Sequence, residues 1–310
     1  MIRFLKYIVK VFSLILVVIL INSIINYRAS DNFSKKVVEN LIDFDSLAVY
    51  INLPERLIVK ERIKKNYSKT IVIGSSRSML IGHPIKFICD NFSVSGASVK
   101  DYIAIAKLVK ANKINFDTLL IEISPWLFNE NQKNERYKTF ENQNINFREL
   151  TSFRYLKDNL TIKKTSIVIK KNDQILYKDG AIRYNQKVIN NIGDLKTIKD
   201  YARNEVFQLE GYNEISEINL KPFLNLINQF KNKKIVFLVY PYPPATYKKI
   251  LSKYPNVYKA DSIIRTVAEK NSNIQIVGSL DPKINDIKNK DFYDGMHLTP
   301  TGIKKIIKKL

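Results

Sequence analysis

A buried strand that ends in serines is the first feature of this sequence that could carry out chemistry. Residues 71–73 form an apolar, β-branched run, and residues 74–78 follow with the sequence Gly-Ser-Ser-Arg-Ser. Three interpretations are open. A serine could cap the start of a helix, the backbone N–H groups of the junction could bind phosphate, or a serine could attack a carbonyl carbon. The last interpretation requires a base elsewhere in the chain.

Histidine is the side chain best suited to accept the serine proton, and the chain has only two. His297 lies three positions after Asp294, and a carboxylate at that spacing can hold one tautomer of the imidazole. A helix follows at "TPTG", where a hydroxyl cap and a proline open its first turn. We therefore expect His297 to be the base and His83 to be structural.

The elements that would position these residues alternate between strand and helix. Strand-like runs occupy residues 70–76, 91–96, 117–124, 234–244 and 274–280. Helix-like periodicity covers residues 100–113, 220–233 and 260–273. This alternation predicts an α/β fold, a three-layer α/β/α sandwich with a mostly parallel sheet.

The carboxyl ends of parallel strands commonly form ligand sites. Ser76, Gly96 and Ser124 all fall at such ends. Residues 125–215 break the alternation and are rich in Asn, Lys and Tyr. We expect them to form a polar insertion, either a cap or a subdomain that faces the substrate.

The N-terminus predicts a membrane anchor. The apolar stretch from Tyr7 to Ile25 approaches the ~20 residues that cross a bilayer, with Arg3, Lys6 and Lys10 on its N-terminal side. These cations predict a cytoplasmic N-terminus and an extracytoplasmic remainder, as in a single-pass protein of a bacterial cell membrane. A cleaved signal peptide is the alternative, although "NYRAS" is a poor cleavage site.

This anchor sets the expected domain boundaries. They are 1–27 for the cytoplasmic tip and transmembrane signal anchor, 28–66 for a stalk or membrane-proximal segment, and 67–310 for the catalytic domain.

The composition limits the partners. The 310 residues carry 51 Lys and Arg against 29 Asp and Glu, a formal net charge of +22, which favours anionic partners. Export would make nucleic acid an unsuitable partner. Cys89 is the single cysteine, so neither an intrachain disulfide nor a Cys-rich zinc site can form. The sequence has no metal-ligand cluster and no dinucleotide or P-loop glycine pattern, so we expect no cofactor.

Taken together, "VIGSSRS", "SVSGAS" and "YDGMHLTPTG" resemble the SGNH/GDSL superfamily of hydrolases and acyltransferases. The resemblance covers residues 68–124 and 216–310. It implies a flavodoxin-like sandwich with Ser76 as the nucleophile. It also implies that Gly96 and Ser76 donate backbone N–H groups to an oxyanion hole, and that Asp294 and His297 complete a triad.

The chain lacks one oxyanion-hole donor that the family usually has. The family usually supplies an oxyanion-hole Asn in a Gly-x-Asn-Asp block, where this chain has "EISPW". Ser124 could replace this Asn, or the backbone donors could act alone. Arg77 is a candidate for binding an anionic substrate group, with a surface role as the alternative. Trp126 is a candidate sugar platform, with a core or lid role as the alternative.

The Gly-Ser-Ser form is similar to membrane-anchored members that modify cell-surface polymers, including proteins of D-alanyl transfer to teichoic acid. The resemblance therefore implies a serine esterase or O-acyltransferase acting on a cell-surface glycan or teichoic-like polymer. A membrane partner protein could supply the acyl donor. The alternative is a non-catalytic protein of the same fold that binds an anionic polymer or supports a cell-envelope assembly.

Overall fold

A five-stranded parallel sheet forms the centre of the protein. The computed structural model describes residues 2–49, 54–65, 68–131, 135–141, 174–190, 192–204, 209–308 and 310. The strand order is β3-β2-β4-β7-β8, and each neighbouring pair is parallel. The strands are β2 (Thr70–Ile73), β3 (Asp90–Asn91), β4 (Thr118–Glu122), β7 (Lys234–Val239) and β8 (Ile274–Gly278). The expected strand at 91–96 is thus short, although the N–H groups of Phe92 and Val94 still donate to the carbonyls of Val72 and Gly74.

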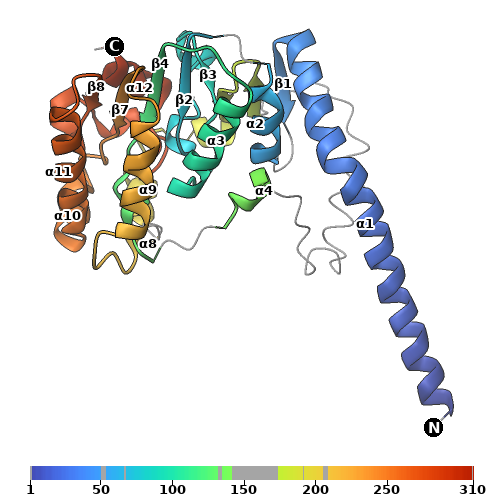
Figure 1. Cartoon of the computed structure of the whole chain (residues 1–310). Helices are drawn as coiled ribbons and strands as arrows, with labels where there is room; N and C mark the ends of the chain where they lie inside the picture. Colours follow the sequence, from blue (N-terminus) through green and yellow to red (C-terminus); the bar gives the residue numbers. More distant parts are fainter. Residues whose placement is uncertain are drawn as a thin grey trace.

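Helices cover both faces of this sheet (Figure 1). Successive residues of a strand point to opposite faces. Ile235 and Phe237 of β7 accordingly lie in one apolar cluster, and Val236 and Leu238 lie in the other. The first cluster includes residues of α3 (Val99–Ala111), α9 (Glu217–Asn228), α10 (Tyr247–Lys253) and α11 (Asn256–Glu269). The second includes residues of α12 (Pro300–Ile307). The predicted α/β fold with a mostly parallel sheet is confirmed.

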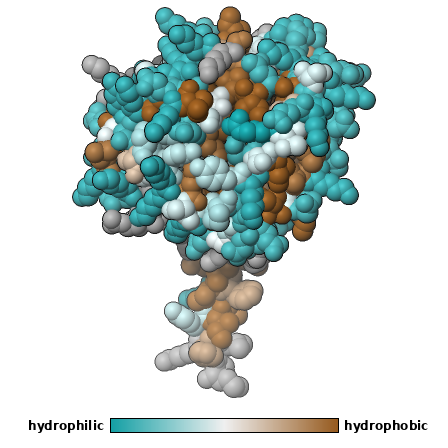
Figure 2. All heavy atoms as spheres, turned by 90° about the vertical axis from the view of Figure 1, so that its left-hand side faces the viewer, coloured by the Kyte–Doolittle hydropathy of each residue, from teal (hydrophilic) through white to brown (hydrophobic). Residues whose placement is uncertain are grey.

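The N-terminal helix α1 (Ile2–Phe44) extends away from this body, with the N-terminus at its far end (Figure 1). Its C-terminal part packs on the protein, because Val37, Val38 and Leu41 are buried. Its N-terminal part exposes apolar side chains and forms the narrow stalk of Figure 2. These are Phe4, Tyr7, Ile8, Val9, Val11, Phe12, Leu14, Ile15, Leu16, Val17, Leu20 and Ile21.

Among the residues that the structure describes, no helix has the length and apolarity needed to span a bilayer. The expected span ends at residue 25, and the side chains of residues 22–33 lie outside the described residues.

The segment 28–66 is not a simple stalk. The strand β1 (Ser46–Val49) and the helix α2 (Glu55–Ile63) both join the body. Val59 and Ile63 pack in the same cluster as the central sheet, while Ile58 packs with the end of α1. The helix α2 therefore packs both on the main sheet and on the end of α1, although it precedes the expected boundary at residue 66.

The insertion also joins the N-terminal segment. Its strands β5 (Gln174–Tyr177) and β6 (Ile182–Arg183) pair antiparallel, and β5 pairs antiparallel with β1. The resulting three-stranded sheet has the order β1-β5-β6. The other described helices of the insertion are η3 (Pro125–Phe128), α4 (Lys138–Glu141), α7 (Gln186–Ile189) and α8 (Leu195–Asn204). The interval 142–173 lies outside the described residues.

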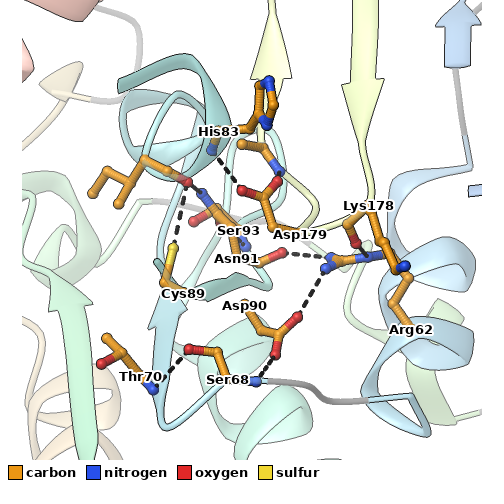
Figure 3. Close-up of polar contacts among 12 residues, drawn as sticks. Arg62, Ser68, Thr70, His83, Cys89, Asp90, Asn91, Ser93, Lys178 and Asp179 are labelled. Atoms are coloured by element: carbon orange, nitrogen blue, oxygen red, sulfur yellow. Dashed lines mark hydrogen bonds and ion pairs between the residues drawn. The ribbon is translucent and has the colours of Figure 1, made fainter. Parts of the chain in front are cut away.

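A polar cluster holds the β5–β6 hairpin against the main sheet (Figure 3). Arg62 of α2 donates to the carbonyls of Asn91 and Lys178 and forms an ion pair with Asp90. The Asn91 N–H in turn donates to the Asp179 carbonyl. Both partners of the ion pair are about 95% buried, with side-chain exposures of 5% and 4%. One guanidinium therefore joins α2, β3 and the hairpin turn.

His83 belongs to the same junction. Its backbone N–H donates to the Asp179 carboxylate, and its ring stacks on Tyr177 with centroids 4.3 Å apart. The Asn91 side-chain amide donates to the carbonyls of Ser78 and Ile81. The segment that follows β2 is therefore held against β3 at this junction. His83 accordingly contributes to docking of the hairpin.

We predict that Arg62→Ala lowers the free energy of unfolding by about 3–5 kcal/mol, because it leaves a buried carboxylate without its cation. Urea titration of the full-length protein in detergent micelles measures this change. Arg265→Ala is the control, since its ion pair with Asp261 is partly exposed and should contribute less than about 1 kcal/mol. Equal losses in the two variants would contradict the docking role of Arg62.

Candidate active site

Three side chains from opposite ends of the chain form a hydrogen-bonded series. Ser76 begins the short helix η1 (Ser76–Ser78) directly after β2, and Asp294 and His297 lie in the loop before α12. The Nε2 atom of His297 lies 2.8 Å from the Ser76 Oγ, and its Nδ1 lies 2.8 Å from the Asp294 Oδ2. The structure thus brings together Ser76, His297 and Asp294, the three residues that the resemblance assigned to a triad.

The Asp294 carboxylate orients the histidine through both of its oxygens. Its Oδ1 accepts the backbone N–H groups of Met296 and His297, each at 2.7 Å, while Oδ2 faces the ring. Burial alone would raise the pKa of Asp294, but the hydrogen bonds from His297 and the nearby backbone lower it below its ordinary value. The group is therefore a carboxylate at neutral pH. An Nδ1–H that donates to it leaves Nε2 free to accept the Ser76 proton.

A buried carboxylate holds the serine turn in place. Glu122 ends β4, the strand beside β2, and its side chain is fully buried. It accepts hydrogen bonds from the Ser75 N–H and hydroxyl, and from the hydroxyls of Ser78 and Ser124. Every one of these neighbours is a donor. Glu122 therefore fixes residues on both sides of Ser76.

Gly74 makes room for this arrangement. A β-carbon at Gly74 would lie 2.7 Å from the Cβ and Oγ of Ser78 and 3.0 Å from a Glu122 oxygen. Distances this short are clashes, so a larger residue would displace either the serine or the carboxylate. Glycine is required here because the side chains of Ser78 and Glu122 approach its Cα closely. This use of glycine is distinct from its use in turns with positive φ.

The insertion contributes a tyrosine to the site. The hydroxyl of Tyr184, which follows β6, donates to the Ser76 carbonyl at 3.2 Å. Its ring meets those of Tyr293 and His297 edge to face, with centroids 5.2 and 6.1 Å apart. Burial raises the pKa of Tyr184 well above its ordinary value, so it remains a neutral donor. The hairpin therefore contacts both the candidate nucleophile and the candidate base.

The loop that carries Gly96 lies beside the serine turn. The Val94 N–H donates to the Gly74 carbonyl, and Gly96 adopts a positive φ of 57°. The preceding residue, Ser95, donates its N–H and hydroxyl to Glu55 of α2. The expected oxyanion-hole glycine thus lies on a loop fixed from α2, a helix that was expected to belong to the stalk.

Ser124 does not occupy the place of the absent Asn. It is fully buried, and its single hydroxyl proton is directed to Glu122. That proton is therefore not available to an oxyanion, which corrects the suggestion that the Ser124 side chain is a donor. Of the oxyanion-hole donors that the sequence analysis expected, the backbone N–H groups of Ser76 and Gly96 remain.

Arg77 and Trp126 are not exposed to substrate. Both are 2% exposed, and the guanidinium of Arg77 lies over the rings of Trp126, Tyr240 and Tyr242. Its Nη2 donates to the Pro241 carbonyl at 2.7 Å. Arg77 therefore packs at the end of the sheet beneath the turn, so neither its expected substrate contact nor its alternative surface role is found. For Trp126 the sugar platform is wrong, and the alternative core role is the one that the structure shows.

The sequence analysis missed Glu122 and Tyr184. Glu122 carried a signal, because it is a charged residue within the apolar run "DTLLIEIS", and a charge at a buried strand end requires partners. Tyr184 carried none, since it is one of several tyrosines in a polar insertion.

No protein-family model matches this chain, and no curated protein matches it. The described residues contain no group of three or more His, Cys, Asp or Glu side chains placed to hold a metal ion. The SGNH resemblance stays a prediction, and the residue geometry carries the functional argument.

We predict that Glu122→Gln lowers the free energy of unfolding, although the side chains have nearly the same size. Each Glu122 oxygen accepts at least two hydrogen bonds, so an amide nitrogen at either position forces serine hydroxyls to turn from donor to acceptor or leaves the Ser75 N–H unpaired, at a cost of about 1–3 kcal/mol. Urea titration measures the change. Glu214→Gln removes the same charge from an exposed loop and should stay within about 0.5 kcal/mol of wild type. A Glu122→Gln protein as stable as this control would contradict the bracing role.

Proposed function

We propose that this protein is a serine esterase or O-acyltransferase. The observation that carries the proposal is the series from Ser76 Oγ through His297 to Asp294, with 2.8 Å at each step. A nucleophile within reach of a base, and a base oriented by a third group, is the arrangement that activates serine. The partial exposure of Ser76 and His297 leaves the site accessible from solvent.

The geometry supports a two-step acyl transfer. His297 Nε2 takes the Ser76 proton as Oγ attacks the ester carbonyl carbon, and the resulting oxyanion accepts hydrogen bonds from the Ser76 and Gly96 N–H groups. His297 then gives its proton to the departing alcohol oxygen, which leaves an acyl-Ser76 ester. Water or an acceptor hydroxyl attacks this ester in the same way, and Ser76 recovers its proton through His297.

The substrate class follows from charge, anchor and resemblance together. We propose a cell-surface glycan or teichoic-like polymer, with a membrane partner protein that supplies the acyl donor. A net charge of +22 favours polyanionic polymers over neutral lipids as the bound partner. A body held near a membrane by one helix can reach polymers in the cell envelope.

We further propose that α1 anchors the protein as a single-pass membrane segment with a cytoplasmic N-terminus. The support is the row of exposed apolar side chains between Phe4 and Ile21, on a helix that leaves the body (Figures 1 and 2). Exposed apolar side chains in such number are unusual for a surface in contact with water.

Labelling with a fluorophosphonate probe tests the catalytic proposal. The full-length protein should label covalently, Ser76→Ala should abolish labelling, and His297→Ala should slow it by at least about 10³-fold, because the base is lost. Ser252→Ala, which removes an exposed serine on α10, should label like wild type. Absence of Ser76-dependent labelling in a folded protein would favour the non-catalytic alternative.

Extraction of membranes with alkaline carbonate tests the anchor. Wild-type protein should stay in the membrane pellet, whereas Leu16→Arg with Leu20→Arg should be released, since each Arg in a span costs about 2.5–3.5 kcal/mol. The control places the same substitutions at exposed apolar residues of the body, Ile218 and Ile284, and should stay in the pellet. Release of the wild-type protein by carbonate would refute the anchor.

A further inference from the structure

One tyrosine of the insertion contacts both the candidate nucleophile and the candidate base. The Tyr184 hydroxyl donates to the Ser76 carbonyl at 3.2 Å, and its ring lies edge to face with the His297 ring at 6.1 Å between centroids. Tyr184 is half-buried and follows β6, so it reaches the site from a part of the chain that contains none of the triad residues. The two contacts act on the site in different ways.

The first contact fixes the peptide bond that follows Ser76. The carbonyl of this peptide accepts the Tyr184 hydroxyl, and its N–H, which belongs to Arg77, donates to the Ser75 Oγ at 3.3 Å. The Ser75 hydroxyl is itself held by Glu122. The peptide is therefore bound on both sides, and its orientation helps to set the direction in which the Ser76 side chain leaves the backbone.

The second contact limits movement of the imidazole. The Asp294 carboxylate holds the His297 ring at Nδ1, and a hydrogen bond at one atom leaves the ring able to tilt. The Tyr184 ring lies at 69° to the His297 ring and at 85° to the ring of Tyr293, whose N–H donates to the His297 carbonyl. Edge-to-face packing at such centroid distances is favourable, so it opposes a tilt of Nε2 away from the Ser76 Oγ.

The hairpin brings Tyr184 to the site through contacts of its own. Ile182 of β6, two positions before Tyr184, donates its N–H to the Met79 carbonyl at 2.7 Å. Met79 directly follows η1, and it packs in one apolar cluster with Ile182, Leu176 and the end of α1. The strand β6 and the residue after it thus meet the serine turn at two points.

We propose that Tyr184 is a positioning residue, which holds the Ser76 hydroxyl and the His297 ring in line for proton transfer. The inference rests on the proposed function, since it concerns the same serine and histidine. A displacement of about 1 Å at a reacting group can slow a reaction about 10²-fold. The hairpin is therefore part of the apparatus that activates the serine, a role additional to the cap or substrate-facing subdomain expected from the sequence.

Two variants separate the hydroxyl from the ring. Tyr184→Phe keeps the ring and removes the hydrogen bond, whereas Tyr184→Leu removes both. Fluorophosphonate labelling of the full-length protein in detergent, measured over a range of probe concentrations, separates the maximal labelling rate from the affinity for the probe. We expect the maximal rate to fall by about 3–10-fold in Tyr184→Phe and by about 30-fold or more in Tyr184→Leu, with the affinity unchanged.

The matched controls are Tyr258→Phe and Tyr258→Leu. Tyr258 is an exposed tyrosine of α11, and its hydroxyl lies 3.3 Å from that of Tyr247. These variants remove the same atoms as the Tyr184 variants, and both should label at the wild-type rate.

Histidine resonances show whether the hairpin stays docked in the Tyr184 variants. The chain has two histidines, so isotope labelling of histidine alone gives a simple spectrum. His83 stacks on Tyr177 of the same hairpin, whereas His297 meets Tyr184. In Tyr184→Leu the His297 signal should shift and broaden, because the ring loses its aromatic neighbour and tilts, while the His83 signal should stay in place.

Two results would overturn the inference. One is a Tyr184→Leu protein that labels at the wild-type maximal rate. The other is a loss of rate together with movement of the His83 signal, because the whole hairpin would then have shifted and the effect would be structural. Failure of the catalytic proposal would look different. Ser76 would then not label in the wild type, while a His297 signal that depends on Tyr184 would still establish that Tyr184 holds the ring.

Discussion

The buried carboxylate of Glu122 is the interaction on which the candidate site depends. A charge removed from water must be matched by donors, and here the donors come from Ser75, Ser78 and Ser124. Because these serines surround Ser76, satisfying the carboxylate also fixes the turn that presents the Ser76 hydroxyl. The pattern of serines after β2 thus has two functions. One serine faces the histidine, and its neighbours donate hydrogen bonds to the Glu122 carboxylate at the end of β4.

The parallel sheet explains how residues 221 positions apart can meet. All its strands point the same way, so the loops that follow them gather at one edge. The turn after β2, the loop with Gly96 and the segment with His297 each reach that edge separately. The insertion reaches it by another route, because Arg62 and Asp179 dock its hairpin on β3 (Figure 3). Tyr184, which follows the hairpin, then donates its hydroxyl to the Ser76 carbonyl.

Arginines in this protein serve different purposes according to burial. Arg62 and Arg77 are enclosed, so neither guanidinium is exposed to a ligand. Arg136, which precedes α4, is exposed. A positive formal charge of +22 therefore does not by itself identify a binding surface. What matters is which cations lie outside the core and beside the reacting groups.

The sequence by itself determined the features that depend on local pattern. Alternating apolar runs predicted the α/β sheet and its helices, and the spacing of Asp294 and His297 predicted a carboxylate that orients a ring. Burial and long-range pairing are different, because a residue's exposure depends on elements distant in the chain. Only the tertiary structure decided that Arg77 and Trp126 are enclosed and that the Ser124 hydroxyl belongs to Glu122. It also decided that α2 and the insertion help to build the site.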